Sequence, residues 1–415
     1  MLNGVGAPNG PRIQPFDRWF RYPAGFSATS LAECAAVIGA GPGSVIGDPF
    51  AGVGTTGVHA INLGASFIGI EVHPLIAELA ALKFQPVECP RCLEQRAVHL
   101  TSNLVPADVE FEHSLVKRSF TPVALERLVA IREAVASLEH DPWHLHLKWC
   151  LLGALRDCAS VKVGWPYQRP AVARVPRIAD PERAFMRRVH SMASDLESMP
   201  QSFEGSIQLG DSRDPGVWAL ALGETLLDGV ISSPPYLNNF DYADATRLEL
   251  YFWGLARSWR EMTTLVRADM VVASTQQCRN KTTLEAAQLL FEVCPVTAQE
   301  ISGCQERLSD ERRKRPRGKQ YDLLLPSYFA DLARVLANMR SYVVPGALIT
   351  LVLGDSAPYG VYVDTPRLVA TAAAEIGFTH LDTKQLRQRG LRWHSNGVRH
   401  SVGLAEQLIL LRAPS

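Results

Sequence analysis

Residues 44–57 have the sequence Ser-Val-Ile-Gly-Asp-Pro-Phe-Ala-Gly-Val-Gly-Thr-Thr-Gly. The apolar residues that lead to Asp48 are typical of a buried strand, and they run directly into a turn rich in glycine. Residues 56–63 then have the pattern of a helix, and residues 67–71 have that of a second strand. A strand, a glycine turn, a helix and a strand within about 30 residues form a βαβ unit, which predicts a parallel sheet.

The glycine turn predicts a cofactor that resembles a nucleotide. Residues 52–57 match the pattern Gly-x-Gly-x-x-Gly, and Glu71 follows Gly52 by 19 residues. Glycines let a ligand approach the backbone closely, and a carboxylate after the second strand can accept hydrogen bonds from both ribose hydroxyls. Taken alone, this pattern suits a nicotinamide oxidoreductase equally well. A turn that needs glycine only for its backbone angles is the simplest alternative.

Further strands and helices are expected much later in the chain. The expected strands are Ser206–Asp211, Leu227–Ser232 and Ala347–Leu353, and Phe378–Leu381 and Gln407–Leu411 are expected to close the sheet as an antiparallel pair. Helical periodicity occurs at Tyr328–Tyr342 and Pro366–Ile376, and Pro345-Gly346 is expected to turn the chain between the first of these helices and the next strand.

Two long stretches interrupt this α/β pattern, and both exceed ordinary connections in length. The first is Pro86–Gln201, which is mainly helical in pattern, and the second is Leu237–Pro326. The sequence therefore predicts an α/β core with two large, mainly helical insertions. The core is expected in residues 1–85, 202–240 and 326–415, and the insertions in residues 86–201 and 241–325.

Ser233-Pro234-Pro235-Tyr236 follows the fourth expected strand. Two consecutive prolines fix the backbone, so the flanking carbonyls and side chains point in set directions. Groups held in this way can accept hydrogen bonds from an aromatic amine, whose delocalised lone pair otherwise makes it a poor nucleophile. A proline turn that only ends a strand is the structural alternative.

These motifs together resemble those of the amino-methylating DNA methyltransferases of the Ser-Pro-Pro-Tyr type. The resemblance rests on Asp48-Pro49-Phe50 before the glycines, on Glu71-Val72-His73-Pro74, and on the later proline turn, in that order, with Phe20–Ser27 as a further motif upstream. It implies a Rossmann-like methyltransferase sheet and S-adenosyl-L-methionine as the cofactor. The residues that it assigns to cofactor binding are Tyr22, Asp48, Phe50, Gly52, Gly54, Thr55, Thr56, Glu71 and Asp211.

The resemblance also implies how each group acts. The glycine turn receives the methionine part of the cofactor, Glu71 binds the ribose, and Asp211 contacts the adenine amino group. Ser233 and the carbonyl of Pro234 accept hydrogen bonds from the target amine. Pro235 completes the rigid turn, and Tyr236 stacks on a base that is flipped out of double-stranded DNA.

Serine in the first position of the proline turn is usual among cytosine-N4 methyltransferases, so Ser233 favours methylation at cytosine N4. Adenine N6 is the first alternative, and an RNA or protein amino-methyltransferase is the second. A catalytically silent DNA-binding subunit is an alternative from another class, but the intact glycine turn and Tyr236 argue against it.

DNA recognition is assigned to the two insertions by elimination, since only Ala413-Pro414-Ser415 follow the last expected strand. The net charge is zero, with 42 basic and 42 acidic residues, so DNA contacts must come from local basic clusters. The expected phosphate contacts are Arg312, Arg313, Lys314, Arg315 and Arg317, together with Arg389 and Arg392 in the expected final hairpin loop. A restriction or phage-defence subunit is a candidate partner in a restriction-modification system.

Composition points to a soluble cytoplasmic protein. Of the 415 residues, 47% are hydrophobic and 20% are charged, and no apolar run reaches the roughly 20 residues that a membrane span needs. The first 20 residues lack the apolar segment of a signal peptide. Cys89 and Cys92 have zinc-knuckle spacing, but a structural zinc needs four ligands. We therefore expect no metal site, although zinc binding by this pair stays open.

Overall fold

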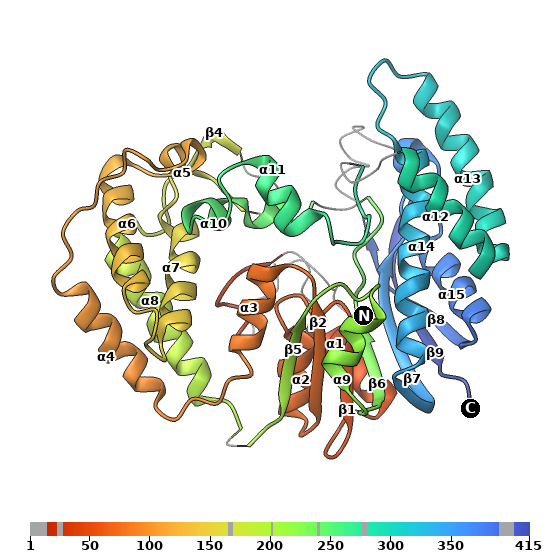
Figure 1. Cartoon of the computed structure of the whole chain (residues 1–415), viewed down its shortest axis with the longest axis horizontal. Helices are drawn as coiled ribbons and strands as arrows, with labels where there is room; N and C mark the ends of the chain where they lie inside the picture. The colour runs from red at the N-terminus through yellow and green to blue at the C-terminus, as the bar shows by residue number, and fades with distance from the viewer. Residues whose placement is uncertain are drawn as a thin grey trace.

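A computed structural model describes residues 15–22, 28–164, 169–200, 202–238, 241–275, 280–389 and 402–415. Its centre is a seven-stranded sheet with the strand order β5-β2-β1-β6-β7-β9-β8 (Figure 1). The parallel strands are β1 (Val45–Asp48), β2 (Ser66–Glu71), β5 (Gly205–Leu209), β6 (Leu227–Ser232) and β7 (Val343–Gly354). Strand β9 (Leu404–Arg412) lies antiparallel between β7 and β8 (Thr379–Arg389), which confirms the expected antiparallel pair.

Helices cover both faces of this sheet because its central strands are apolar on both sides. On β6, Ile231 packs into one hydrophobic core and its neighbour Val230 packs into the other. The first core includes α1 (Ala28–Ile38), α2 (Thr55–Asn62) and α3 (Pro74–Leu82), and the second includes α9 (Pro215–Leu222), α14 (Tyr321–Arg340) and α15 (Thr365–Ile376). The predicted Rossmann-like α/β sheet is therefore confirmed.

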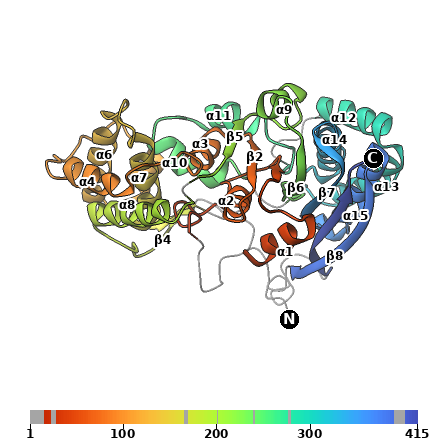
Figure 2. The same ribbon diagram turned by 90° about the horizontal axis from the view of Figure 1, so that it is seen from below.

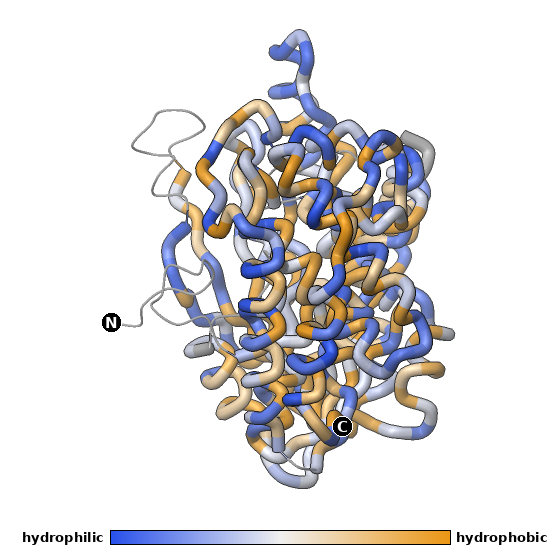
Figure 3. The backbone as a smooth tube through the Cα atoms, turned by 90° about the vertical axis from the view of Figure 1, so that its left-hand side faces the viewer, coloured by the Kyte–Doolittle hydropathy of each residue, from blue (hydrophilic) through white to orange (hydrophobic). Residues whose placement is uncertain are grey.

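Residues 86–200 form a helical lobe beside the sheet. Figure 2 shows this lobe at one end of the molecule and α12 to α15 at the other. The lobe contains α4 (Pro90–Thr101), α5 (Ser114–Ser119), α6 (Pro122–Ala136), α7 (His144–Cys158), α8 (Pro181–Glu197) and a short hairpin of β3 (Val161–Lys162) and β4 (Arg169–Ala173). Apolar and polar residues alternate along its helices (Figure 3), as expected when one face of a helix is buried. Helix α7 is its centre, with Trp149 fully buried.

The N-terminal segment ties the lobe to the sheet. Asp195 of α8 is buried, and its carboxylate accepts hydrogen bonds from the backbone amide of Phe16 and the indole of Trp19, both at 2.9 Å, and from the guanidinium of Arg18. On the other side, the hydroxyl of Thr55 donates to Asp17 at 3.0 Å. The same short segment thus contacts α8 and the start of α2.

The second insertion connects the two ends of the molecule. It contains the 3-10 turn η1 (Asp244–Thr246), α10 (Arg247–Phe252), α11 (Trp259–Met262), the π-helical turn η2 (Thr263–Arg267), α12 (Asn280–Val293) and α13 (Pro295–Arg313). Helix α10 packs against α5 of the lobe, whereas α12 and α13 pack against α14, one of the helices that cover the sheet. In the part of the chain that the structure describes, no helix could cross a membrane.

Two expected boundaries were wrong. Helix α14 begins at Tyr321 rather than Tyr328, and Pro326 lies inside it near its start. Pro345 and Gly346 do not form a turn before β7, as was expected, but lie within that strand. Leu227 pairs with Val343 and Gly229 with Leu348, so a bulge absorbs the extra residues, and Gly346 takes a φ of 78° there.

Candidate active site

The glycine turn has the backbone shape that its sequence predicts. Gly52 and Gly54 have φ values of 53° and 79°, a region that side chains disfavour. Gly57 serves packing instead, because a Cβ atom there would lie 2.4 Å from the ring of Phe67. The turn joins the end of β1 to α2, whose N-cap is Gly54. An open backbone at a helix N-terminus suits a ligand that carries a carboxylate.

Asp48 fixes this turn to the rest of the sheet. Its carboxylate is buried and accepts hydrogen bonds from the hydroxyls of Ser232 and Thr56, at 2.6 and 2.8 Å, and from the amide of Phe50 at 3.0 Å. Burial raises the pKa of Asp48 to about 6. The residue therefore joins the start of the glycine turn to the end of β6. Its expected role in cofactor binding stays a prediction.

Glu71 stands between two turns at the end of β2. One carboxylate oxygen accepts from the amide of Gly52 and the other from the amide of His73, both at 2.8 Å. Burial raises the pKa of Glu71 to about 7. Each oxygen retains a lone pair, so the carboxylate can also accept hydrogen bonds from two ligand hydroxyls. The geometry suits the ribose contact that was expected of it.

Asp211 follows β5, next to the end of β2, since the amide of Gly210 donates to the carbonyl of Glu71 at 3.0 Å. The Nε atom of Arg213 lies 2.9 Å from both Asp211 oxygens, and Arg213 also contacts Asp331 at 2.8 Å. Sequence reasoning missed Arg213, although it lies two residues after the acid. The expected contact of Asp211 with the cofactor adenine stays a prediction.

Tyr22 lies at the end of the described N-terminal segment, near Glu71. Its ring centroid is 6.3 Å from that of Tyr242, and burial, followed by the charge of Glu71, raises the pKa of Tyr22. Phe50 is half-buried against the second core, and Thr55 and Thr56 begin α2. The structure thus gathers the expected cofactor residues around the ends of β1 and β2. Residues 23–27 of the upstream motif lie outside the described residues.

The proline turn is held by both neighbouring elements. The hydroxyl of Ser233 donates to the carbonyl of Val352 on β7 at 3.1 Å, and the hydroxyl of Tyr328 on α14 donates to the carbonyl of Pro235 at 2.9 Å. Because the Ser233 proton is used in this way, the lone pairs of its oxygen remain available as acceptors. This geometry suits a group that accepts a hydrogen bond from an amine.

Tyr236 is fixed at its hydroxyl and covered on its ring. The hydroxyl donates to Glu406 at 2.7 Å, and Arg387 contacts the same buried carboxylate at 3.0 Å. The guanidinium carbon of Arg389 lies 5.0 Å from the ring centroid of Tyr236. Arg389 therefore lies beside the proline turn, at the end of β8. Sequence reasoning missed Glu406, because no local pattern links β9 to a turn 170 residues earlier.

The basic cluster at the C-terminal end of α13 is largely paired with acids. Arg313 contacts Asp310, Lys314 and Arg315 contact Glu311, and Arg312 contacts Asp322 at 3.0 Å. Its contact with DNA stays a prediction, as does that of Arg317. Arg392 lies outside the described residues.

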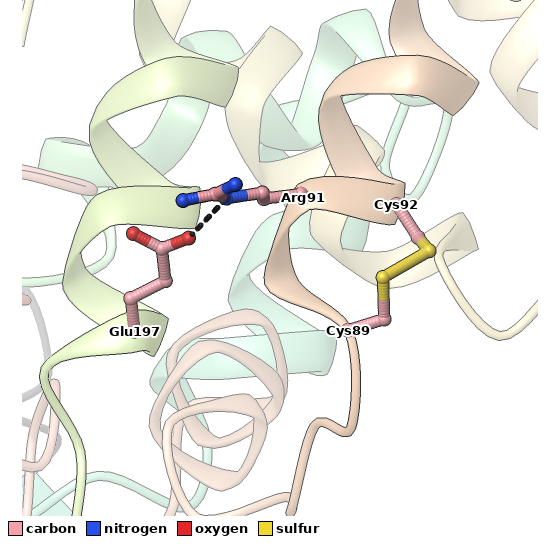
Figure 4. The surroundings of a disulfide bond; sticks show 4 residues. All are labelled: Cys89, Arg91, Cys92 and Glu197. Carbon is pink, nitrogen blue, oxygen red and sulfur yellow. Dashed lines mark hydrogen bonds and ion pairs between the residues drawn. A yellow bond between two sulfur atoms is a disulfide. The ribbon is translucent and has the colours of Figure 1, made fainter.

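Cys89 and Cys92 form a disulfide bond at the start of α4, where Arg91 between them pairs with Glu197 at 3.1 Å (Figure 4). Zinc binds thiolates, so the oxidised pair cannot serve as zinc ligands. Among the described residues, no group of three or more histidine, cysteine or acidic side chains could hold a metal ion.

The raised pKa of Glu71 predicts a pH dependence of cofactor binding. Hydroxyl groups donate to the ionised carboxylate more strongly than to the protonated one. With a pKa of about 7, the ionised share increases about tenfold between pH 6 and pH 8. We therefore expect the affinity for S-adenosylmethionine to rise by up to about tenfold over this interval, as measured by calorimetry. The Glu71→Gln variant should lose this dependence, and an equal slope in that variant would assign the titration to another group.

Comparisons with known proteins agree with this arrangement. A family model described as DNA methylase, of the N6/N4 type, matches residues 14–82, which contain the glycine turn and Glu71. The Type II methyltransferase M.BsoBI of Geobacillus stearothermophilus is 22% identical over 427 residues, which cover 91% of this chain and 81% of that protein.

Solved structures show weaker similarity. TrmN from Thermus thermophilus is 10% identical with a TM-score of 0.33, over 96% of this chain and 52% of that one. The rRNA methyltransferase aviRa from Streptomyces viridochromogenes is 12% identical with a TM-score of 0.30, over 98% of this chain and 87% of that one. This chain thus spans about half the length of TrmN.

Proposed function

We propose that this chain is an S-adenosylmethionine-dependent methyltransferase of the amino-methylating N6/N4 type and that it methylates the exocyclic amine of a base in double-stranded DNA. The observation that carries the proposal is the anchored proline turn. The Ser233 hydroxyl donates a hydrogen bond to the carbonyl of Val352 and keeps its lone pairs, and Tyr236 is fixed by its hydrogen bond to Glu406. A site built to hold an acceptor and an aromatic ring in set positions suits an aromatic amine as the target.

The residues around the glycine turn fit S-adenosylmethionine. When bound, this cofactor supplies a methyl group activated by a positive sulfonium. The turn at Gly52 and Gly54 leaves room for its amino-acid part, and the buried carboxylate of Glu71 has lone pairs for the ribose hydroxyls. Tyr22 would cover this end of the site from the N-terminal segment, because Glu71 is among its charged neighbours.

The proline turn would activate the target amine. The Ser233 oxygen and the Pro234 carbonyl would accept hydrogen bonds from its two N–H groups, which draws the nitrogen towards a tetrahedral shape and localises its lone pair. The nitrogen lone pair held in this way would be the acceptor of the methyl group that the bound cofactor supplies. The nitrogen gives up one proton to solvent or to an adjacent acceptor. No covalent bond between protein and base is required, so a cysteine nucleophile is unnecessary.

The base must leave the duplex to reach this turn, and the ring of Tyr236 would provide its stacking surface. In the structure Arg389 lies over that ring, so an entering base would have to displace its guanidinium. Cytosine N4 is the proposed position, since Ser233 is the residue usual in cytosine-N4 enzymes. The name of the Geobacillus relative supports a role in restriction and modification, for which a restriction or defence subunit is the proposed partner. Such an enzyme acts in the cytoplasm.

One experiment decides between the possible substrates. The protein is incubated with labelled S-adenosylmethionine and with unmethylated genomic DNA, total RNA or protein extract, and the modified product is identified by mass spectrometry. We expect N4-methylcytosine in DNA. N6-methyladenine would replace the proposed base but keep the reaction, whereas label found only in RNA or protein would overturn DNA as the substrate.

A further inference from the structure

A single buried carboxylate in the helical lobe faces three arginines. Asp157, at the end of α7, has no exposed surface. Arg187 and Arg188 contact one of its oxygens at 2.8 and 2.7 Å, and Arg177 lies 3.9 Å from the other. The side chains of Arg177 and Arg187 are 63% and 52% exposed. One negative charge therefore meets three positive charges, and two of the three side chains extend into solvent.

Two more arginines lie beside this group. Arg174 donates from Nε to the carbonyl of Ala159 at 3.0 Å. Burial, followed by the charge of Arg177, lowers the pKa of both Arg174 and the exposed Arg21. Three arginines already share the single charge of Asp157, and these two lie close enough to Arg177 to be affected by its charge. The surface around Arg177 therefore has an excess of positive charge, and this arrangement costs free energy unless an anion binds there.

This basic surface, defined by Arg21, Arg174, Arg177 and Arg187, adjoins the candidate active site. Arg156 makes the connection, because its guanidinium donates to the carbonyls of Arg21 and Ala245, at 2.5 and 2.8 Å, and to Glu249 at 2.7 Å. Ala245 lies nine residues after Tyr236, and Arg21 precedes Tyr22. The surface thus lies where the lobe, the N-terminal segment and the chain after the proline turn meet.

The basic cluster at the C-terminal end of α13 differs in its charge balance. Its four residues from Arg312 to Arg315 contact Asp310, Glu311 and Asp322, so acids within reach neutralise most of their charge. Around Asp157, by contrast, Arg177, Arg187 and Arg188 share a single carboxylate. The basic surface of the lobe therefore attracts a polyanion more strongly than the loop that the sequence favoured.

We propose that the basic surface binds the sugar–phosphate backbone of DNA beside the target base, with Arg177 and Arg187 contacting phosphates directly. This inference rests on the proposed function, because it assumes DNA as the substrate. Guanidinium groups bind phosphate oxygens in pairs, and each neutralised phosphate releases a counterion. The lobe would thus hold the DNA in place, while base recognition could come from other residues.

The test is the salt dependence of DNA binding by an Arg177→Gln/Arg187→Gln double variant. The affinity for a fluorescent DNA duplex is measured from about 50 to 200 mM salt. In a plot of the logarithm of the affinity against the logarithm of the salt concentration, each phosphate contact is expected to contribute a slope of about −0.9. Because two contacts are removed, the slope of the double variant should be shallower by about 2, and the variant should bind DNA at least about tenfold more weakly. The corresponding double lysine variant keeps the charge and should retain most of the slope.

Arg91→Gln is the matched control. Arg91 is in the same lobe and is 82% exposed, but it pairs with Glu197, so its removal should leave the slope unchanged. An unchanged slope in the Arg177/Arg187 variant, with parent protein that binds DNA, would overturn this inference alone. If the same variant bound S-adenosylmethionine more weakly but DNA as before, the surface would belong to the cofactor site, and the inference would also be overturned. If the parent binds RNA but no DNA, the proposed function and the inference both fail.

Discussion

Tyr236→Ala is expected to slow methyl transfer about a hundredfold, because stacking of a base on an aromatic ring contributes about 1–3 kcal/mol. Its affinity for S-adenosylmethionine should stay within about twofold of the parent value, since the contacts of Tyr236 lie with Glu406 and Arg389 rather than at the glycine turn. Single-turnover rates on DNA and calorimetry with the cofactor measure the two quantities. Loss of cofactor binding in this variant would instead show that Tyr236 and the proline turn support the fold.

Tyr236→Phe separates the ring from its hydroxyl. This variant keeps the stacking surface but removes the hydrogen bond to Glu406, whose carboxylate then retains Arg387. We expect a smaller decrease in rate, about tenfold or less, because only the orientation of the ring is relaxed. A decrease as large as that of the alanine variant would mean that the hydroxyl bond, and not stacking, dominates.

Glu71→Ala is expected to weaken S-adenosylmethionine binding about a hundredfold or more, since a hydrogen bond to a charged group contributes about 1.5–3 kcal/mol. The substitution removes the proposed acceptor of the ribose hydroxyls. It also leaves the amides of Gly52 and His73 without their partner, so the glycine turn loses its support from β2. Calorimetric titration of the variant with the cofactor measures the change.

The Glu71→Gln variant is the control for shape. The amide side chain fills the same space, but only its oxygen accepts hydrogen bonds. It should bind the cofactor with intermediate affinity and unfold at a temperature below that of the parent, because its NH2 group faces one of the two amides that donate to Glu71. Parent-like affinity in both variants would show that the carboxylate does not contact the cofactor, whatever the fate of the fold.

Much of the core could be predicted from sequence because its signals are local. The strand that ends at Asp48 and the strand before Ser233 are short apolar runs that end in turn residues, and both occur as β1 and β6. Gly52 and Gly54 take backbone angles that only glycine adopts easily, which is why the glycine pattern alone predicted this turn. The C-terminal antiparallel pair was also predicted, although β8 extends to Arg389.

Contacts between distant segments could not be predicted in this way. Glu406 meets Tyr236, and Asp195 of the lobe holds Phe16, only because the fold brings them together. Charge balance was only partly visible, since Asp310 and Glu311 directly precede the basic run, whereas the pairing of Arg312 with Asp322 depends on the fold. Pro326 favoured a later helix start, because proline usually marks a boundary.

The order of the strands has a consequence for synthesis on the ribosome. Strands β1 and β2 are complete at Glu71, but β6, which pairs with the free edge of β1, begins only at Leu227. A ribosome needs about 8–30 s for the roughly 150 residues between them, at about 5–20 residues per second. The helical lobe is one continuous stretch and can fold during that time. Until β6 emerges, the unpaired backbone N–H and C=O groups along this edge of β1 remain exposed in the nascent chain.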